Sequence, residues 1–216
     1  MIGTFDTYYA RPEVSNSDLS ALEFYFMNKE RMYDLQAAYR FGNLIDALIT
    51  EPDRCDHLNL RVDDEQFNPF EWSLAKKMYH AFYADPFCVQ LLNNADGQNV
   101  IVEDLLINYE GFEFILPSRC KFDLLAKAMR TGADIKSTVA VTHDQFLKSI
   151  THFNYDKQGA FYMDMAKIDK HMIIGISKIN YKIFKVPMVR DGELYNSGKK
   201  KYSEWAFKYW YLFENF

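Results

Sequence analysis

The spacing of apolar residues divides the chain into helical stretches on either side of a central block of strands. From residue 99 onward, apolar and polar positions alternate with a period of two, which predicts β-strands. Tyr109-Glu110-Gly111 is expected to turn the chain between the first two strands. The predicted strands cover residues 99–107, 112–117, 119–125 (a continuation or a separate strand), the segment around 134–136, 172–179 and 181–186.

Helical spacing is found before, between and after these strands. Ser15 or Ser17 can cap a first helix that runs to about residue 33, and Pro86 is expected to divide a later one. Polar residues 55–69 predict a loop. The other predicted helices cover residues 36–50, 70–93, 143–152, 155–163 and 199–216.

The order of these elements predicts an α/β fold. Helices, three strands, helices, two strands and a final helix favour a mixed central β-sheet flanked by helices on both faces. The length suits one domain over residues 1–216, with a core at about 36–190 and the first and last helices as additions.

Composition indicates a packed globular protein. Of 216 residues, 49% are hydrophobic and 17% aromatic. The formal net charge of −5 argues against a generic basic coat for nucleic acid but is compatible with a local basic groove. Cys55, Cys88 and Cys120 form no CxxC pair, which predicts reduced structural cysteines. No apolar run approaches the ~20 residues of a membrane span, so we expect a soluble, cytoplasmic protein without a membrane partner.

The segment from Asp123 to Lys136 carries the main candidate chemistry. Two strands joined by a short connection would bring Asp123 beside Asp134. Side chains alternate along a strand, so Asp134 and Lys136 share a face and Ile135 points to the core. Two carboxylates beside a lysine call for a neutralising divalent cation, and oxygen ligands favour Mg²⁺ or Mn²⁺. The alternative is a solvated strand face, which is common for Asp-x-Lys.

Gly42 and Asp46 lie one helical turn apart and therefore share a face of the predicted helix at 36–50. A glycine inside a helix costs roughly 1 kcal/mol relative to alanine, and it is tolerated where another group must approach the backbone. Asp46 beside this bare patch is a candidate ligand. The alternative is an exposed aspartate on a helix.

Other polar residues lie on elements that are otherwise apolar. Tyr155, Gln158 and Tyr162 share one face of the helix at 155–163, where they would bind a ligand or form a hydrogen-bonded core network. Glu103 either faces solvent at a sheet edge or joins the carboxylates, and Glu113 leaves the same choice open.

In their order along the chain, these motifs resemble the PD-(D/E)XK nuclease superfamily, and within it the phage and prophage recombination exonucleases of the RecE (exonuclease VIII) type. The resemblance covers about residues 14–190 and implies a restriction-endonuclease-like core. It rests on Ser-x-Leu at the first helix, Phe-Gly-Asn-Leu-Ile in the second, Lys-Phe-Asp, Asp-Ile-Lys-Ser-Thr and Tyr-Asp-x-Gln-x-Ala-Phe-Tyr.

The resemblance implies a role for each motif. It makes Asp123, Asp134 and the Ile135 carbonyl metal ligands, and it makes Lys136 the residue that positions or activates the attacking water. The further residues that it implies are Asp46 and Glu103 as metal ligands, and Gly42, Tyr155, Gln158 and Tyr162 as substrate contacts. The chain departs from the pattern with Asp46, where histidine is usual, and with Phe122, where proline is common.

The resemblance also implies a function. It predicts an Mg²⁺-dependent DNA exonuclease, with Mn²⁺ as a possible substitute, that hydrolyses phosphodiester bonds from duplex ends in phage-type homologous recombination. A single-strand annealing protein would be its partner, and a homo-oligomer is expected. The alternatives are an endonuclease of the same superfamily and a catalytically inactive DNA-binding module.

Overall fold

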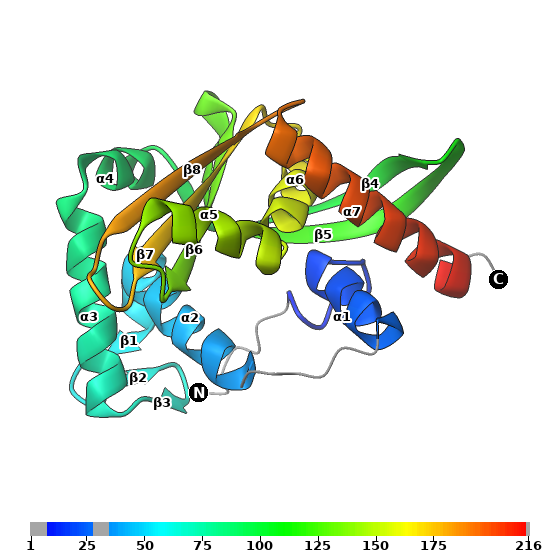
Figure 1. The fold of residues 1–216 in the computed structure, drawn as a ribbon. Helices are drawn as coiled ribbons and strands as arrows, with labels where there is room; N and C mark the ends of the chain where they lie inside the picture. The colour runs from blue at the N-terminus through cyan, green and yellow to red at the C-terminus, as the bar shows by residue number, and fades with distance from the viewer. Residues whose placement is uncertain (1–7, 28–34, 215–216) are drawn as a thin grey trace.

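A five-stranded mixed sheet runs through the computed structural model, which describes residues 8–27 and 35–214. The strand order is β4-β5-β6-β7-β8 (Figure 1). The strands are β4 (Asp96–Tyr109), β5 (Phe112–Ala126), β6 (Thr131–Thr138), β7 (Lys170–Ser177) and β8 (Ile183–Val189). Only β6 and β7 are parallel neighbours in this sheet. Because parallel strands need a crossover, α5 (His143–His152) and α6 (Tyr155–Ala166) connect these two.

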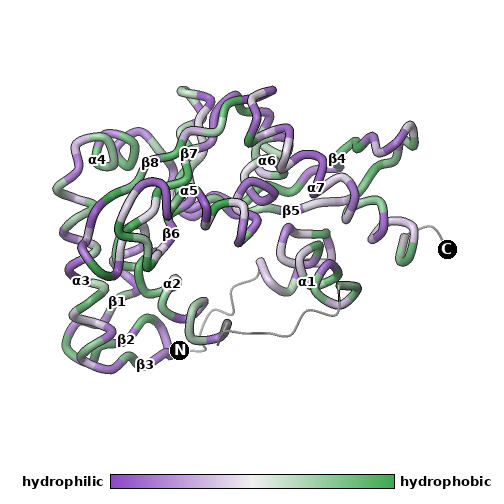
Figure 2. The backbone as a smooth tube through the Cα atoms, in the orientation of Figure 1, coloured by the Kyte–Doolittle hydropathy of each residue, from purple (hydrophilic) through white to green (hydrophobic). Residues whose placement is uncertain are grey.

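Helices cover both faces of the sheet, which confirms the predicted fold class. One apolar core joins it to α2 (Leu35–Thr50), α3 (Pro69–Ala84) and α4 (Pro86–Asn93). A second core joins it to α1 (Asn16–Phe26), α5, α6 and α7 (Glu193–Tyr209). The tube in Figure 2 is green along much of β7, where residues on both strand faces are buried. No described helix combines the length and the apolar character needed to cross a membrane.

Several predicted helix boundaries shift for local reasons. α1 begins after a capping box between Ser15 and Asp18 and ends at Phe26, while predicted helical residues 28–33 lie outside the described residues. Pro86 divides α3 from α4 as predicted, and the Asp85 side chain caps α4. The last helix starts at Glu193 rather than at residue 199, and a π-helical segment, Trp210–Glu214, follows it.

The prediction of a plain loop at residues 55–69 is wrong. This segment forms a separate three-stranded antiparallel sheet of β1 (Cys55–Asp56), β2 (Arg61–Val62) and β3 (Glu65–Gln66). Each strand has two residues, which is too short to produce an alternating pattern in the sequence. Val62 and Phe67 anchor the small sheet by packing into the core shared with α2 and α3.

Candidate active site

β5 and β6 bring Asp123 and Asp134 together just beyond their last paired residues, as the predicted hairpin required. A single 3₁₀ turn, η2 (Lys127–Met129), joins the two strands, whose pairing extends no further than Leu124 and Ala133. Beyond that point, the Ile135 amide donates a hydrogen bond to Asp123 Oδ2 at 2.6 Å. The N–H and C=O of one strand residue point to the same side, so the Ile135 carbonyl also faces the Asp123 side.

Lys136 lies on the same face of β6 as Asp134, with its Nζ 3.9 Å from Asp134 Oδ2. Ile135 is buried on the opposite face, which confirms the predicted alternation. The Lys136 ammonium also lies 5.3 Å from the centre of the Tyr155 ring. Burial lowers the pKa of Lys136, but Asp134 and Asp123 outweigh that effect and raise it overall. The ammonium is therefore charged at neutral pH.

Three aspartates of this site have interdependent charges. Burial, and then the charge of Asp134, raise the pKa of Asp123 to about 7. Burial, and then the charge of Asp123, raise the pKa of Asp46 well above its ordinary value. Burial also acts against ionised Asp134, but Lys136 and His171 more than compensate and lower its pKa. The cluster thus carries more carboxylates than its cations neutralise, and added positive charge would stabilise it.

The unpaired oxygens of these carboxylates fit a hard divalent cation. Within the described part of the chain, Asp46 Oδ1 and Asp134 Oδ1 are buried without a hydrogen-bond partner. A Cβ added to Gly42, one turn before Asp46, would meet no atom within 4 Å, so α2 leaves open space there. Among the same described residues, no three His, Cys, Asp or Glu groups converge as a ready-made metal site. Mg²⁺ needs fewer, because it binds through one or two carboxylates and keeps several waters.

His171 is a member of the site that the sequence analysis missed. It is 1% exposed, and its Nε2 lies 3.2 Å from Asp134 Oδ2. Because an ionised Asp134 can only accept hydrogen bonds, Nε2 must be the protonated ring nitrogen, and its N–H donates a hydrogen bond to Asp134 Oδ2. The ring packs against Phe122 at 5.9 Å between centroids. His171 reaches Asp134 only through the parallel pairing of β7 with β6, which leaves no local signal in the sequence.

Lys121 was also missed, although a signal for it existed. Its positive charge lowers the pKa of both Asp123 and Asp46, in each case as a minor contribution. It stands two residues before Asp123 on β5, at the spacing that places two strand residues on one face. The i, i+2 rule that paired Asp134 with Lys136 therefore also pairs Lys121 with Asp123.

Two ion pairs tie α6 to its neighbouring helices. Lys157 binds Glu23 of α1 at 2.6 Å, and Asp156 binds Lys201 of α7 at 2.7 Å. Tyr155, the first residue of α6, lies over Lys136, as described above.

Tyr162, on the same helix, is 7% exposed and packs against Phe122 at 5.0 Å between centroids. Gln158, which is partly buried, hydrogen-bonds to it. This placement supports the alternative of a hydrogen-bonded core network, and the role of Tyr162 as a substrate contact stays a prediction.

Glu103 does not join the carboxylates, which corrects its prediction as a metal ligand. It is exposed on the outer strand β4 and pairs in register with Ser118 of β5. Ser118 precedes Asp123 by five residues, or roughly 16 Å along an extended strand. Glu113, opposite Asn108, is exposed and lies still further along the hairpin. The length of the β4–β5 hairpin carries both glutamates away from the site.

Two carboxylates and a lysine at the diverging ends of two strands, in a mixed sheet between helices, are the arrangement of the PD-(D/E)XK nuclease superfamily. A model of the family described as "PDDEXK-like domain of unknown function (DUF3799)" matches residues 18–186, and the chain belongs to this family. No curated protein matches the chain.

Solved structures with a similar course of the chain come from several bacteria. A candidate exonuclease from Eubacterium rectale has 12% identity and a TM-score of 0.54, over 94% of this chain and 77% of its own, which shows the shared fold. A phage-related exonuclease from Haemophilus somnus 129PT has 12% identity and a TM-score of 0.43, over 96% and 86% of the two chains. An alkaline exonuclease from Laribacter hongkongensis has 16% identity and a TM-score of 0.40, over 93% and 90%.

Proposed function

We propose that the protein is an Mg²⁺-dependent deoxyribonuclease that hydrolyses phosphodiester bonds from the ends of duplex DNA. The observation that carries this proposal is the partly buried cluster of Asp123, Asp134 and Lys136, in which Asp134 Oδ1 lacks a partner among the described residues and the pKa of Asp123 is raised to about 7. The nuclease fold supports the same reaction class.

Asp123, Asp134 and the Ile135 carbonyl would hold the metal, with Asp46 as a further carboxylate in place of the usual histidine. Bound divalent ions would stabilise charge on the phosphate oxygens and lower the pKa of a bound water. His171 would fix the orientation of Asp134 by donating to Oδ2, which leaves Oδ1 for the metal.

Lys136 would act as a positive hydrogen-bond donor. Its raised pKa keeps the ammonium protonated at neutral pH, so positioning the attacking water is better supported than removing a proton from it. The same positive charge would offset part of the negative charge of the scissile phosphate. The Tyr155 ring beside Nζ would limit the movement of the side chain.

A cleavage assay tests this proposal directly. Linear and covalently closed circular duplex DNA are incubated with the protein and Mg²⁺, and then with Mn²⁺. We expect loss of the linear form alone, and no loss with Lys136→Ala. The control is Lys208→Ala, which should behave like wild type. The Lys208 ammonium pairs with Glu204 on the surface. Cutting of the circle would indicate an endonuclease, and no cutting with either metal would leave an inactive DNA-binding module.

The proposed setting is phage-type recombination, with duplex DNA ends as substrate, a single-strand annealing protein as partner and a homo-oligomer as the working form. The resemblance to RecE-type exonucleases supports these three points. Exposed Tyr211 and Phe213 after α7 are compatible with an interface, since aromatic residues are enriched there. Light scattering tests the assembly, and a monomer at every protein concentration would contradict it.

A further inference from the structure

Lys178 stands directly beside the strand that carries the candidate catalytic motif. It follows the last residue of β7, and its amide donates to the carbonyl of Thr138 at 2.7 Å. Thr138 is the last residue of β6 and lies two positions after Lys136. The backbone of Lys178 is thus fixed at the end of the sheet toward which Asp134 and Lys136 lead.

The side chain of Lys178 reaches α2 near the open space at Gly42. Its Nζ lies 4.4 Å from the centre of the Phe41 ring. Phe41 immediately precedes Gly42, where an added Cβ would meet no atom within 4 Å, and Asp46 follows one turn later. The aromatic ring therefore holds the Lys178 ammonium over the residue of α2 that directly precedes this open position.

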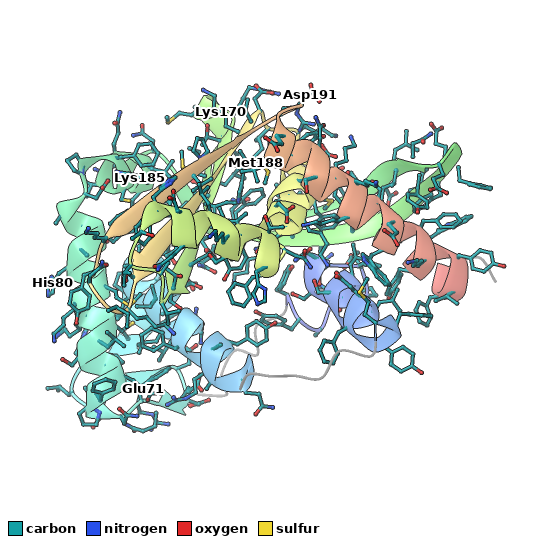
Figure 3. All side chains as sticks on the ribbon, viewed as in Figure 1. Glu71, His80, Lys170, Lys185, Met188 and Asp191 are labelled. Carbon is teal, nitrogen blue, oxygen red and sulfur yellow. The ribbon has the colours of Figure 1, made fainter. Side chains whose placement is uncertain are left out.

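This positive charge lacks a counter-charge within the described part of the chain. Lys178 is partly buried, and burial alone lowers its pKa, with no acidic neighbour among the described residues to raise it. Lys185, labelled on β8 in Figure 3, provides a contrast: it lies 5.5 Å from the Phe87 ring and also pairs with Asp85 at 2.6 Å. The two lysines thus make the same type of cation–aromatic contact, Lys185 with a carboxylate partner and Lys178 without one among the described residues.

We propose that Lys178 binds a backbone phosphate of the DNA strand that enters the active site, away from the bond that is cleaved. A phosphate would supply the missing counter-charge, and the Phe41 ring would keep the ammonium in place to receive it. Such a contact positions the strand without reading its sequence. The inference rests on the proposed function, since it assumes that the ligand of the site is DNA.

The test measures DNA affinity separately from cleavage. A fluorescent duplex with a free end is titrated with protein in EDTA, over a series of salt concentrations. For Lys178→Gln, we expect binding about 3–10-fold weaker and the slope of log Kd against log salt smaller by about 0.9, equally for two unrelated sequences. Lys178→Arg keeps the charge and should bind like wild type. Lys185→Gln removes a lysine that already has a carboxylate partner and should leave both quantities unchanged.

The outcomes separate this inference from the proposed function. If wild type digests DNA but Lys178→Gln binds with unchanged affinity and salt slope, the phosphate contact is wrong and the nuclease assignment stands. If binding depends on Lys178 but no metal supports cleavage, the contact stands and the nuclease assignment is wrong. Thermal unfolding of each variant confirms that it is folded. A loss of affinity in Lys178→Arg equal to that in Lys178→Gln would also overturn the inference, because the charge would then not be the cause.

Discussion

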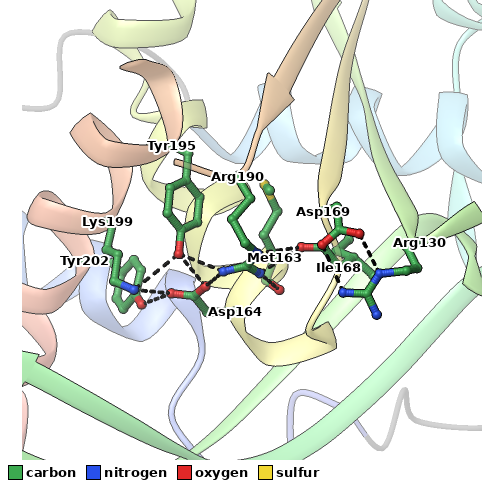
Figure 4. A network of polar contacts seen from close by, with 9 residues as sticks. All are labelled: Arg130, Met163, Asp164, Ile168, Asp169, Arg190, Tyr195, Lys199 and Tyr202. Carbon is green, nitrogen blue, oxygen red and sulfur yellow. Dashed lines mark hydrogen bonds and ion pairs between the residues drawn. The ribbon is translucent and has the colours of Figure 1, made fainter. Parts of the chain in front are cut away.

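The molecule contains two groups of buried or partly buried carboxylates whose charges are balanced in different ways. Asp164 on α6 accepts hydrogen bonds from the Tyr195 and Tyr202 hydroxyls and pairs with Arg190 at 2.7 Å and Lys199 at 3.3 Å (Figure 4). Burial alone would raise its pKa, but these partners lower it overall. The saturated carboxylate ties α6 to the segment after β8 and to α7, and this role is structural.

The aspartates that α2, β5 and β6 contribute to the candidate active site are in the opposite situation. Asp123 and Asp46 have raised pKa values, and Asp134 keeps one oxygen without a partner among the described residues. Leaving buried carboxylates incompletely paired reduces the stability of the fold, so their persistence favours a functional explanation. The difference shows that burial of an acidic side chain does not by itself indicate a functional site. The informative feature is the absence of hydrogen-bond and ion-pair partners that would neutralise the carboxylate.

The largest expected effect on stability concerns Asp164, whose charge is balanced by its partners. Asp164→Asn leaves the partly buried Arg190 without its counter-charge and should lower the free energy of unfolding by about 3–4 kcal/mol. Urea unfolding measures this loss. The matched control is Asp169→Asn, which breaks an exposed pair with Arg130 and should cost no more than about 1 kcal/mol. Equal losses in the two variants would contradict the structural role of Asp164.

For Asp123, whose pKa is raised, removing the carboxylate should raise the free energy of unfolding instead of lowering it. The folded protein holds the Asp123 proton up to about pH 7, whereas the unfolded chain releases it near the ordinary value of 3.8. Without metal, wild type should therefore lose stability as the pH rises from about 4 through 7. Asp123→Asn removes this loss and can still accept the hydrogen bond from Ile135, so it should be about 2–4 kcal/mol more stable than wild type at pH 8.

Urea unfolding in EDTA at pH 5 and pH 8 checks this prediction for both proteins. The gain should fall by more than half at pH 5, where the folded wild type still holds the Asp123 proton and only the unfolded chain has released it. An Asp123→Asn protein less stable than wild type at pH 8 would show that the site carboxylates are already balanced.

A smaller effect should separate the role of His171 from simple packing. His171→Phe keeps an aromatic ring against Phe122 but removes the donor to Asp134, so Mn²⁺ and Mg²⁺ affinity should fall about 10–100-fold. His171→Gln retains a donor and should recover part of this loss. Isothermal titration calorimetry measures both. Wild-type metal affinity in His171→Phe would limit the histidine to a packing role.

The sequence predicted the parts of this site that depend on local spacing. The shared face of Asp134 and Lys136 follows from strand alternation, and the approach of Asp123 follows from one short connection. His171 and Lys178 depend on the parallel pairing of β7 with β6, which follows a crossover of two helices. No local pattern encodes that register.

The fold was predictable to the same degree. Long periodic elements such as α2 and β5 were found, and the two-residue strands β1 to β3 were not, because they are too short to show a period. Glu103 was misassigned for a related reason. An acid among apolar strand residues can face a site or solvent, and only the full length of the β4–β5 hairpin decides which.

The smallest expected effect tests which acidic residues belong to the candidate metal site and which do not. Glu103→Gln changes an exposed side chain on β4 and should alter stability by less than about 0.5 kcal/mol, with metal affinity and cleavage within about two-fold of wild type. Asp46→Asn removes a carboxylate whose pKa responds to Asp123, and it should weaken Mn²⁺ binding measurably in the same titration. If Glu103→Gln lost metal affinity while Asp46→Asn kept it, the hairpin would have to bend back toward α2. The acid that completes the site would then come from the sheet edge and not from the helix.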